Sequence, residues 1–97
     1  VMALEIGEHV PTEFEDVVID NIDKNNQCGA IVSWAVPGQG GHSHVNLRSN
    51  AWVIDRFAQR GYVFDEVVSR RGRESADYEW FKNTFMVFRR SSPGRSC

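Results

Sequence analysis

Patterns typical of strands and of helices alternate along this chain. Apolar runs without internal alternation are typical of strands covered on both faces within a parallel sheet, and apolar residues at helical spacing follow each of the first two runs. The expected segments are strands at 1–6, 30–36, 62–69 and 84–88, and helices at 12–25 and 51–60. This order predicts an α/β fold, a three-layer sandwich around a mainly parallel sheet. Because the last connection is short, the last strand is expected to be antiparallel.

Residues with capping chemistry mark the expected helix ends. Thr12 and Glu15 match the T-x-x-E capping box, in which two side chains satisfy backbone groups reciprocally at a helix start. Asn50 suits the N-cap of the second helix, and Gly61 suits the left-handed residue after its end. The glycine-rich loop at residues 37–49 is long, and loops of that length are usually functional or mobile.

The composition limits the class of protein. A chain of 97 residues, 41% hydrophobic and 25% charged, suffices for one folded domain, expected at residues 1–90 with a flexible tail at 91–97. A net charge of −2 supplies no large positive field, so binding to nucleic acid is not expected. No apolar run approaches the roughly 20 residues that span a bilayer, so no membrane association is expected either.

The cysteines bear on the expected compartment. Cys28 and Cys97 are too few for a disulfide framework and do not form a C-x-x-C pair. The chain also lacks the basic-then-apolar start of a signal peptide. A reducing compartment fits these features, and a cytoplasmic location is therefore predicted.

Ionisable side chains gather where the first strand ends. In LEIGEHVPTEF, residues 4–14, Glu5, Glu8 and His9 directly follow the apolar run. The loop after the second strand carries His42 and His44. Ligand sites of open parallel sheets lie beyond the carboxyl ends of the strands. If the first two strands are adjacent and parallel, the two loops meet and all these side chains can share one cleft.

Two carboxylates and one or two imidazoles suit a divalent cation. Oxygen-dominated sites favour Mg²⁺ or Mn²⁺, whereas imidazoles favour Fe²⁺, Co²⁺ or Zn²⁺. In a continued strand Glu8 would point away from Glu5 and His9, so their convergence requires a turn, expected at Gly7. The alternative is purely structural: a glutamate here stabilises the positive end of the following helix, and His9 forms a hydrogen bond in a packed turn.

Two segments resemble parts of a known family. LEIGEHVP resembles the end of the fourth strand in class I S-adenosylmethionine-dependent methyltransferases, where an E-x-x-E-H-hydrophobic-P pattern is frequent. SWAVPGQGGHSHVN resembles the loop after the fifth strand, and the order of elements over residues 1–90 is similar to the second half of that fold. The resemblance implies the C-terminal, acceptor-side half of a methyltransferase that acts on a small-molecule acceptor.

The resemblance also implies a metal site. The ubiquinone-type O-methyltransferases and the small-RNA 2′-O-methyltransferases use E-x-x-E-H to bind a divalent metal near the acceptor hydroxyl. By this resemblance Glu5, Glu8 and His9 are ligands, and His44 or His42 is a further ligand. The metal lowers the pKa of the acceptor hydroxyl, which then attacks the activated methyl group.

The resemblance implies only part of a cofactor site. Glu5, Ile6, Gly7 and His9 are expected to contact S-adenosylmethionine. The glycine-rich turn and the acidic residue that hold most of this cofactor in the family are not in the sequence, so a fragment that is inactive alone is expected. Without a preceding strand, residues 1–6 form an apolar edge, which natural proteins avoid or cover. Self-association through this edge is therefore expected.

Two alternatives come from other classes of protein. One is a small noncatalytic α/β module that dimerises through its first strand and binds a metal or a partner protein. The other is metal-dependent hydrolysis, in which a glutamate is the general base on bound water, although the helix-borne H-E-x-x-H pattern is absent. Coding DNA upstream of Val1 that specifies a strand, a glycine-rich turn and a second strand ending in an acidic residue would favour the methyltransferase.

Overall fold

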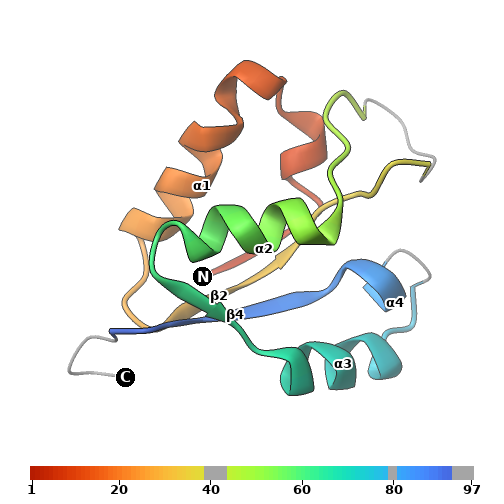
Figure 1. Ribbon diagram of the computed structural model, residues 1–97. Coiled ribbons are helices and arrows are strands. Elements are labelled where there is room, and N and C mark those ends of the chain that lie inside the picture. The colour runs from red at the N-terminus through yellow and green to blue at the C-terminus, as the bar shows by residue number, and fades with distance from the viewer. Residues whose placement is uncertain (39–43, 79–80, 93–97) are drawn as a thin grey trace.

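Four strands form one mixed sheet in the computed structural model, which describes residues 1–38, 44–78 and 81–92 (Figure 1). The strands are β1 (Met2–Leu4), β2 (Gly29–Ser33), β3 (Tyr62–Phe64) and β4 (Met86–Arg90). Their order across the sheet is β1–β2–β4–β3. β1 and β2 are parallel, whereas β4 is antiparallel to both of its neighbours. β1, β2 and β3 therefore run in one direction, and only the last strand is reversed among those described.

Helices connect the strands in the described segments. Two short 3-10 turns, η1 (Gly7–His9) and η2 (Thr12–Phe14), and helix α1 (Glu15–Lys24) lead from β1 to β2, and α2 (Asn50–Ala58) leads from β2 to β3. α3 (Glu66–Ser75) and α4 (Phe81–Thr84) lie between β3 and β4 in the sequence. In Figure 1, α1 and α2 lie on the same side of the sheet. None of these helices has the length and apolar character needed to cross a membrane.

The predicted α/β class and antiparallel last strand are confirmed. The prediction of a mainly parallel sheet is wrong, because β4 inserts between β2 and β3 and makes two of the three described pairings antiparallel. The expected adjacency of the first two strands is confirmed, with Met2 opposite Ile31 and Leu4 opposite Ser33. The loops that leave the carboxyl ends of β1 and β2 therefore start side by side.

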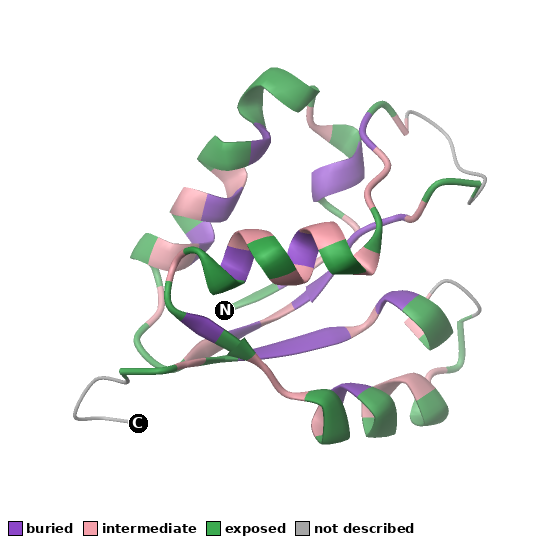
Figure 2. Cartoon of the chain, in the orientation of Figure 1, coloured by how far each residue is buried: buried purple, intermediate pink, exposed green. Residues whose placement is uncertain are grey.

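The hydrophobic core lies between the sheet and the helices α1 and α2 (Figure 2). Alternate residues of β2 and β4 face it, because side chains alternate between the two faces of a strand. Phe57 of α2 stacks on Phe88 of β4 with ring centroids 4.5 Å apart. The core includes Ile19 and Ile22 from α1, Ala30 and Val32 from β2, Val53 and Phe57 from α2, and Met86 and Phe88 from β4.

The strand predicted at residues 62–69 is wrong beyond Phe64. Asp65 caps α3 instead, and its carboxylate accepts a hydrogen bond of 3.0 Å from the amide of Val68. The stretch after Phe64 has strand-like composition, but an aspartate at the N-cap satisfies a backbone N–H that the helix leaves without a partner. Ser69 of α3 then accepts a hydrogen bond of 2.8 Å from the amide of Val87, which attaches α3 to β4.

Asp65 is expected to make the stability of the protein depend on acidic pH. Hydrogen bonds from the Val68 amide and then from Arg89 hold the pKa of Asp65 below its usual value. The stabilisation is therefore present above the unfolded pKa of about 3.9 and is lost as the pH falls through the folded pKa. Thermal unfolding of the wild type and Asp65→Asn from about pH 2 to about pH 7 checks this. The difference between their midpoints should shrink in acid, and a constant difference would contradict the assignment.

Two predicted helix caps differ from those observed. The capping box of Thr12 and Glu15 is not formed, since α1 begins without a side-chain cap and the Glu15 carboxylate bonds elsewhere. Ser49 rather than Asn50 caps α2, and its hydroxyl accepts a hydrogen bond of 3.1 Å from the amide of Trp52. In both cases the expected capping side chain bonds to a distant residue instead, Glu15 to Asn46 and Asn50 to the carbonyl of Asn83.

β1 is an edge strand of the described sheet. Ala3 faces the core and is 7% exposed, whereas Val1 and Met2 are 46% and 63% exposed. The prediction of an apolar run covered on both faces is therefore wrong for the described structure, in which only one face is covered. The expectation that this strand lies at an edge is confirmed.

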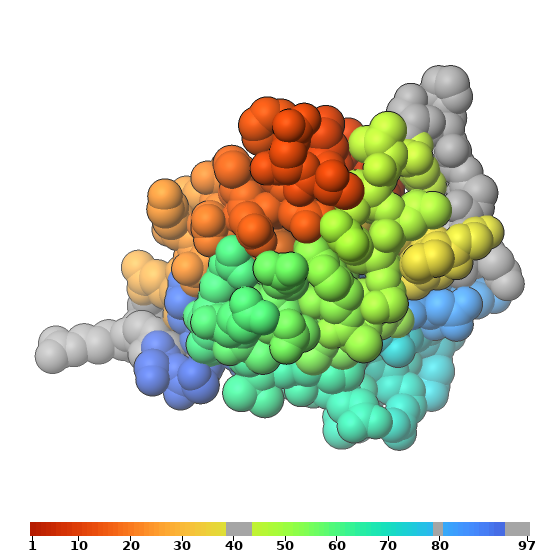
Figure 3. Space-filling model, turned by 45° about the horizontal axis from the view of Figure 1, so that its top comes forward, coloured from red at the N-terminus to blue at the C-terminus, as the bar shows by residue number. Residues whose placement is uncertain are grey.

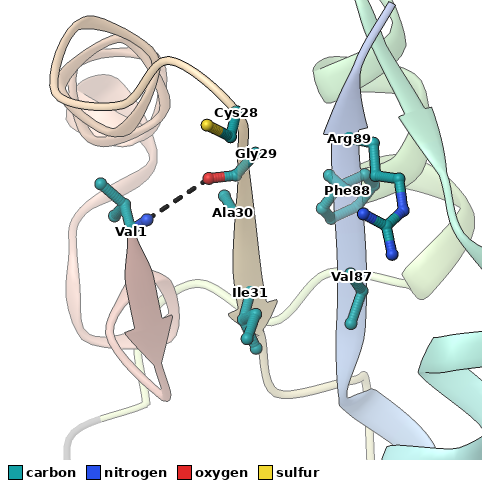
Figure 4. A pocket seen from close by; sticks show the side chains of 8 residues that line it. All are labelled: Val1, Cys28, Gly29, Ala30, Ile31, Val87, Phe88 and Arg89. Carbon is teal, nitrogen blue, oxygen red and sulfur yellow. Dashed lines mark hydrogen bonds between the residues drawn. The ribbon is translucent and has the colours of Figure 1, made fainter. Parts of the chain in front are cut away.

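A hollow of about 210 Å³ opens beside Val1, which precedes β1, over the start of β2 and the middle of β4 (Figure 4). Its lining includes Val1, Ile31, Val87 and Arg89. The N-terminal ammonium of Val1 donates a hydrogen bond of 3.3 Å to the carbonyl of Gly29 beside it. Because β1 and β2 begin here, the hollow lies at the end of the strands opposite to the predicted ligand edge.

Cys28 is disulfide-bonded. Cys97 lies outside the described residues, as does most of the predicted tail. The spacing of the cysteines in the sequence does not predict this bond, because pairing depends on distance in space. Disulfides persist mainly in oxidising compartments, so the cysteines no longer support the predicted cytoplasmic location.

Candidate metal centre

The chain turns out of β1 at Glu5. This residue has a φ of 54°, in the left-handed region, and its amide donates hydrogen bonds to the carbonyl and the hydroxyl oxygens of Ser33 at 3.2 and 2.9 Å. The predicted turn at Gly7 therefore begins before that residue, and η1 completes it. Gly7 is required for a different reason, since a Cβ atom there would overlap the indole ring of Trp34.

Glu8, His9 and His44 converge beyond the carboxyl ends of β1 and β2. Each offers one ligand atom, and these atoms lie within 4.8 Å of one another. The Nε2 atom of His44 is 4.0 Å from a carboxylate oxygen of Glu8. The rings of His9 and His44 meet edge to face with centroids 4.9 Å apart. Three of the four metal ligands predicted from two separate loops, Glu8, His9 and His44, are therefore brought together.

The Glu8 carboxylate is completely buried. The side chain has an exposed fraction of 0%, and neither oxygen accepts a hydrogen bond within the described part of the chain. The Nδ1 atom of His44 is likewise buried without a hydrogen-bond partner there. Buried polar atoms are nearly always hydrogen-bonded, and an isolated buried carboxylate is costly. A cation between Glu8 and the histidines would balance this charge.

The donor set and its dimensions fit a divalent transition metal. One carboxylate and two imidazoles are ligands that Zn²⁺, Co²⁺ and Fe²⁺ share, whereas Mg²⁺ and Ca²⁺ prefer oxygen ligands alone. Two atoms bound to one ion at about 2.1 Å lie at most about 4.2 Å apart. The observed limit of 4.8 Å is slightly larger. Small side-chain rotations would close the site, and its three protein ligands would leave coordination positions open.

The segment that carries His44 is fixed to the first loop by its backbone. The amides of Val45 and Asn46 donate hydrogen bonds of 2.8 and 3.0 Å to the carbonyl of Glu8. The indole N–H of Trp34 donates a hydrogen bond of 2.8 Å to the carbonyl of Asn46. In Figure 3 the yellow-green segment after residue 44 lies against the red-orange segment that contains η1 and the start of α1. The loop thus positions His44 beside Glu8.

Glu15 holds the same segment by its side chain. Its carboxylate accepts a hydrogen bond of 2.9 Å from the side-chain amide of Asn46. It also forms a salt bridge of 2.8 Å with the guanidinium of Arg48. The Arg48 guanidinium also lies 4.6 Å from the ring centre of Trp52. Sequence reasoning missed this network, because it assigned Glu15 to a helix cap and no spacing links residues this far apart.

The remaining predicted site residues do not join the three-residue cluster. Glu5 lies at the turn but is not one of the three clustered residues. His42 lies outside the described residues. Ile6 is 48% exposed, and Gly7 is buried against Trp34. Contacts of Glu5, Ile6, Gly7 and His9 with a cofactor stay a prediction.

Two groups with shifted pKa values, Tyr62 and Arg73, lie outside this cluster and serve the fold. Burial raises the pKa of Tyr62, whose hydroxyl donates a hydrogen bond of 2.9 Å to Asp23 of α1. Burial lowers the pKa of Arg73, which donates a hydrogen bond of 2.8 Å to the carbonyl of Phe85. Tyr62 attaches β3 to α1, and Arg73 attaches α3 to the residue before β4, so neither marks a second chemical site.

Comparison with known proteins identifies no relative. No protein-family pattern, curated protein or solved structure matches the chain. The site must therefore be interpreted from its own geometry and from the resemblance of its short motifs.

Proposed function

We propose that this chain is the acceptor-side, C-terminal half of an S-adenosylmethionine-dependent methyltransferase domain, in which Glu8, His9 and His44 bind a divalent cation. The observation that carries the proposal is the convergence of these side chains, from two loops, beyond the carboxyl ends of two adjacent parallel strands. This edge is where open α/β sheets bind ligands. The buried Glu8 carboxylate supplies a charge that a cation would neutralise.

The strand order supports the proposed fold. In a doubly wound sheet the last three strands lie side by side in sequence order and run in one direction. β1, β2 and β3 follow one another across the sheet in that order and share one direction. The reversed strand β4 lies between β2 and β3, and a reversed last strand is what the resemblance leads us to expect. The three-layer arrangement, with helices on both faces of the sheet, is part of this proposal.

Each residue of the cluster has a distinct part in the proposed chemistry. Glu8 offers a carboxylate oxygen, and His9 and His44 offer ring nitrogens from two different loops. A bound divalent cation lowers the pKa of a hydroxyl group that reaches it, and so makes the hydroxyl a better nucleophile toward an activated methyl group. The exposed side of His9 is the open approach for a small-molecule acceptor.

Cobalt titration of the chelator-treated protein tests the metal site. One Co²⁺ ion should bind per chain, with absorption bands typical of mixed nitrogen and oxygen ligands, and His9→Ala should weaken binding strongly. Glu13→Gln is the matched control, because Glu13 is an exposed carboxylate outside the cluster. Equal binding by the wild type and His9→Ala would refute the site.

Calorimetric titration with S-adenosylmethionine tests the proposal that the chain is half of a methyltransferase domain. The resemblance implies that most contacts to this cofactor come from parts of the fold that the chain does not contain. The isolated chain should therefore bind it only weakly, even when metal is present. Tight binding would show that the division of the cofactor site proposed here is wrong.

A noncatalytic module that dimerises through β1 is the second candidate, favoured by the exposed edge. Met2 is 63% exposed on a strand whose outer side has no neighbour among the described strands. Charged side chains on edge strands oppose edge-to-edge pairing. Met2→Lys is therefore expected to convert a self-associating wild type into a monomer, as measured by sedimentation equilibrium. A wild type that is monomeric at high concentration would eliminate this candidate.

A further inference from the structure

His44 reaches the cluster from a loop distant in sequence from Glu8 and His9, so its position depends on what holds that loop. Backbone bonds from Val45 and Asn46 to the Glu8 carbonyl place the segment beside η1. The amide of Arg48 donates a further hydrogen bond of 2.9 Å to the carbonyl of Ala35. These bonds fix the path of the backbone. The side chains of Asn46 and Arg48 are held in addition by one carboxylate.

That charged group is Glu15, in the first turn of α1. It is 9% exposed, and both of its carboxylate oxygens accept hydrogen bonds. One oxygen accepts from the Asn46 side chain and from two nitrogens of Arg48, and the other accepts from Arg48 at 3.0 Å. Bidentate arginine–carboxylate pairs combine strength with defined geometry. Glu15 therefore specifies the position of the segment that follows His44.

Glu15 also lies shortly after two of the three ligands in the chain. η1 carries Glu8 and His9, and η2 leads directly from there into α1. One continuous stretch thus provides two ligands and anchors the loop that provides the third. A network of this kind orients a ligand without touching the ion, as partners of metal ligands commonly do.

We propose that Glu15 is a positioning residue for the metal site, acting through Asn46 and Arg48 to hold His44 against Glu8. This inference rests on the proposed metal site and adds a determinant of its affinity. Glu15→Gln removes the charge that Arg48 binds while keeping a side chain of nearly the same shape. Co²⁺ affinity is expected to fall by about tenfold or more, the usual effect of losing a partner that orients a ligand.

A double-mutant cycle distinguishes positioning from a general loss of stability. Co²⁺ affinity is measured at one neutral pH for the wild type, Glu15→Gln, His44→Ala and the double variant. If Glu15 acts through His44, Glu15→Gln should have no further effect once His44 is alanine. An equal loss of affinity in both backgrounds, or no loss in either, would overturn the inference.

Matched variants keep the test decisive. Asp16→Asn makes the same change of charge on the neighbouring residue of α1, which pairs with Arg56 and Arg60, and should leave Co²⁺ affinity unchanged. If Glu15→Gln does not fold, Asn46→Ala removes one bond to Glu15 and should give a smaller loss of Co²⁺ affinity with the same dependence on His44.

A wild type that binds no Co²⁺ would overturn the metal site and this inference together. Metal binding that depends on His44 but not on Glu15 or Asn46 would overturn this inference alone.

Discussion

Glu8→Met is expected to stabilise the metal-free protein and to abolish its affinity for a divalent cation. The Glu8 side chain is fully buried, and its oxygens accept no hydrogen bond in the described segments. Replacing buried charges by apolar side chains of similar volume often stabilises a fold by about 1–4 kcal/mol. The same replacement removes the only carboxylate of the cluster. Opposite effects on stability and on binding are a signature that a purely structural glutamate would not give.

Urea unfolding in the presence of a chelator, followed by Co²⁺ titration of the same variants, measures both effects. Glu13→Met is the control, since it changes an exposed carboxylate outside the cluster and should alter neither quantity much. A Glu8→Met protein that is less stable than the wild type without metal would contradict the account. Glu8 would then have a stabilising partner in the metal-free fold.

Gly7→Ala is expected to destabilise the protein and to weaken the metal site together. The added methyl group would overlap the indole ring of Trp34, which is 2% exposed and has little space to move. Overpacking of this kind typically costs about 1–3 kcal/mol. Trp34 also donates a hydrogen bond to the carbonyl of Asn46. A displaced indole would therefore shift the loop that carries His44.

Thermal unfolding and Co²⁺ titration of Gly7→Ala check this, with Gly72→Ala as the matched control. A methyl group on Gly72 would overlap the ring of Phe85, a comparable clash on α3, outside the segments that carry the cluster. Gly72→Ala should therefore change stability but not Co²⁺ affinity, and the higher helix propensity of alanine offsets part of its cost. Unchanged stability and affinity in Gly7→Ala would show that Trp34 does not support the site.

The Glu8 carboxyl group is buried, and its oxygens have no hydrogen-bond partner among the described residues. A carboxylate without hydrogen bonds in the interior reduces the stability of the metal-free fold. Any cation that binds the folded chain in preference to the unfolded chain raises the apparent stability by mass action. The proposed site is therefore coupled to folding, and the metal-free protein is expected to be the less stable form.

The sequence predicts the members of the cluster better than the way they are held. The E-x-x-E-H spacing after an apolar run identifies Glu8 and His9, and the parallel adjacency of β1 and β2 brings His44 to them. The spacing does not reveal which of the two glutamates, Glu5 or Glu8, belongs to the cluster. The left-handed turn at Glu5 rotates the chain before η1 and leaves Glu5 outside the cluster.

Other features depend on contacts between distant residues and leave no local signal. Glu15 matches a helix-capping motif. It forms a salt bridge instead, because Arg48, from a loop distant in sequence, lies beside it in the fold. Gly7 looks like a turn residue, although the close approach of Trp34 is what excludes a side chain. The start of α3 has strand-like composition, and the cap formed by Asp65 decides the outcome.

Crystals grown with Co²⁺ and measured at the cobalt absorption edge test the central claim most directly. The account predicts one anomalous peak about 2.0–2.2 Å from a carboxylate oxygen of Glu8 and from a ring nitrogen of each of His9 and His44. A map with no peak among these three side chains, at a cobalt concentration that saturates binding in solution, would contradict it.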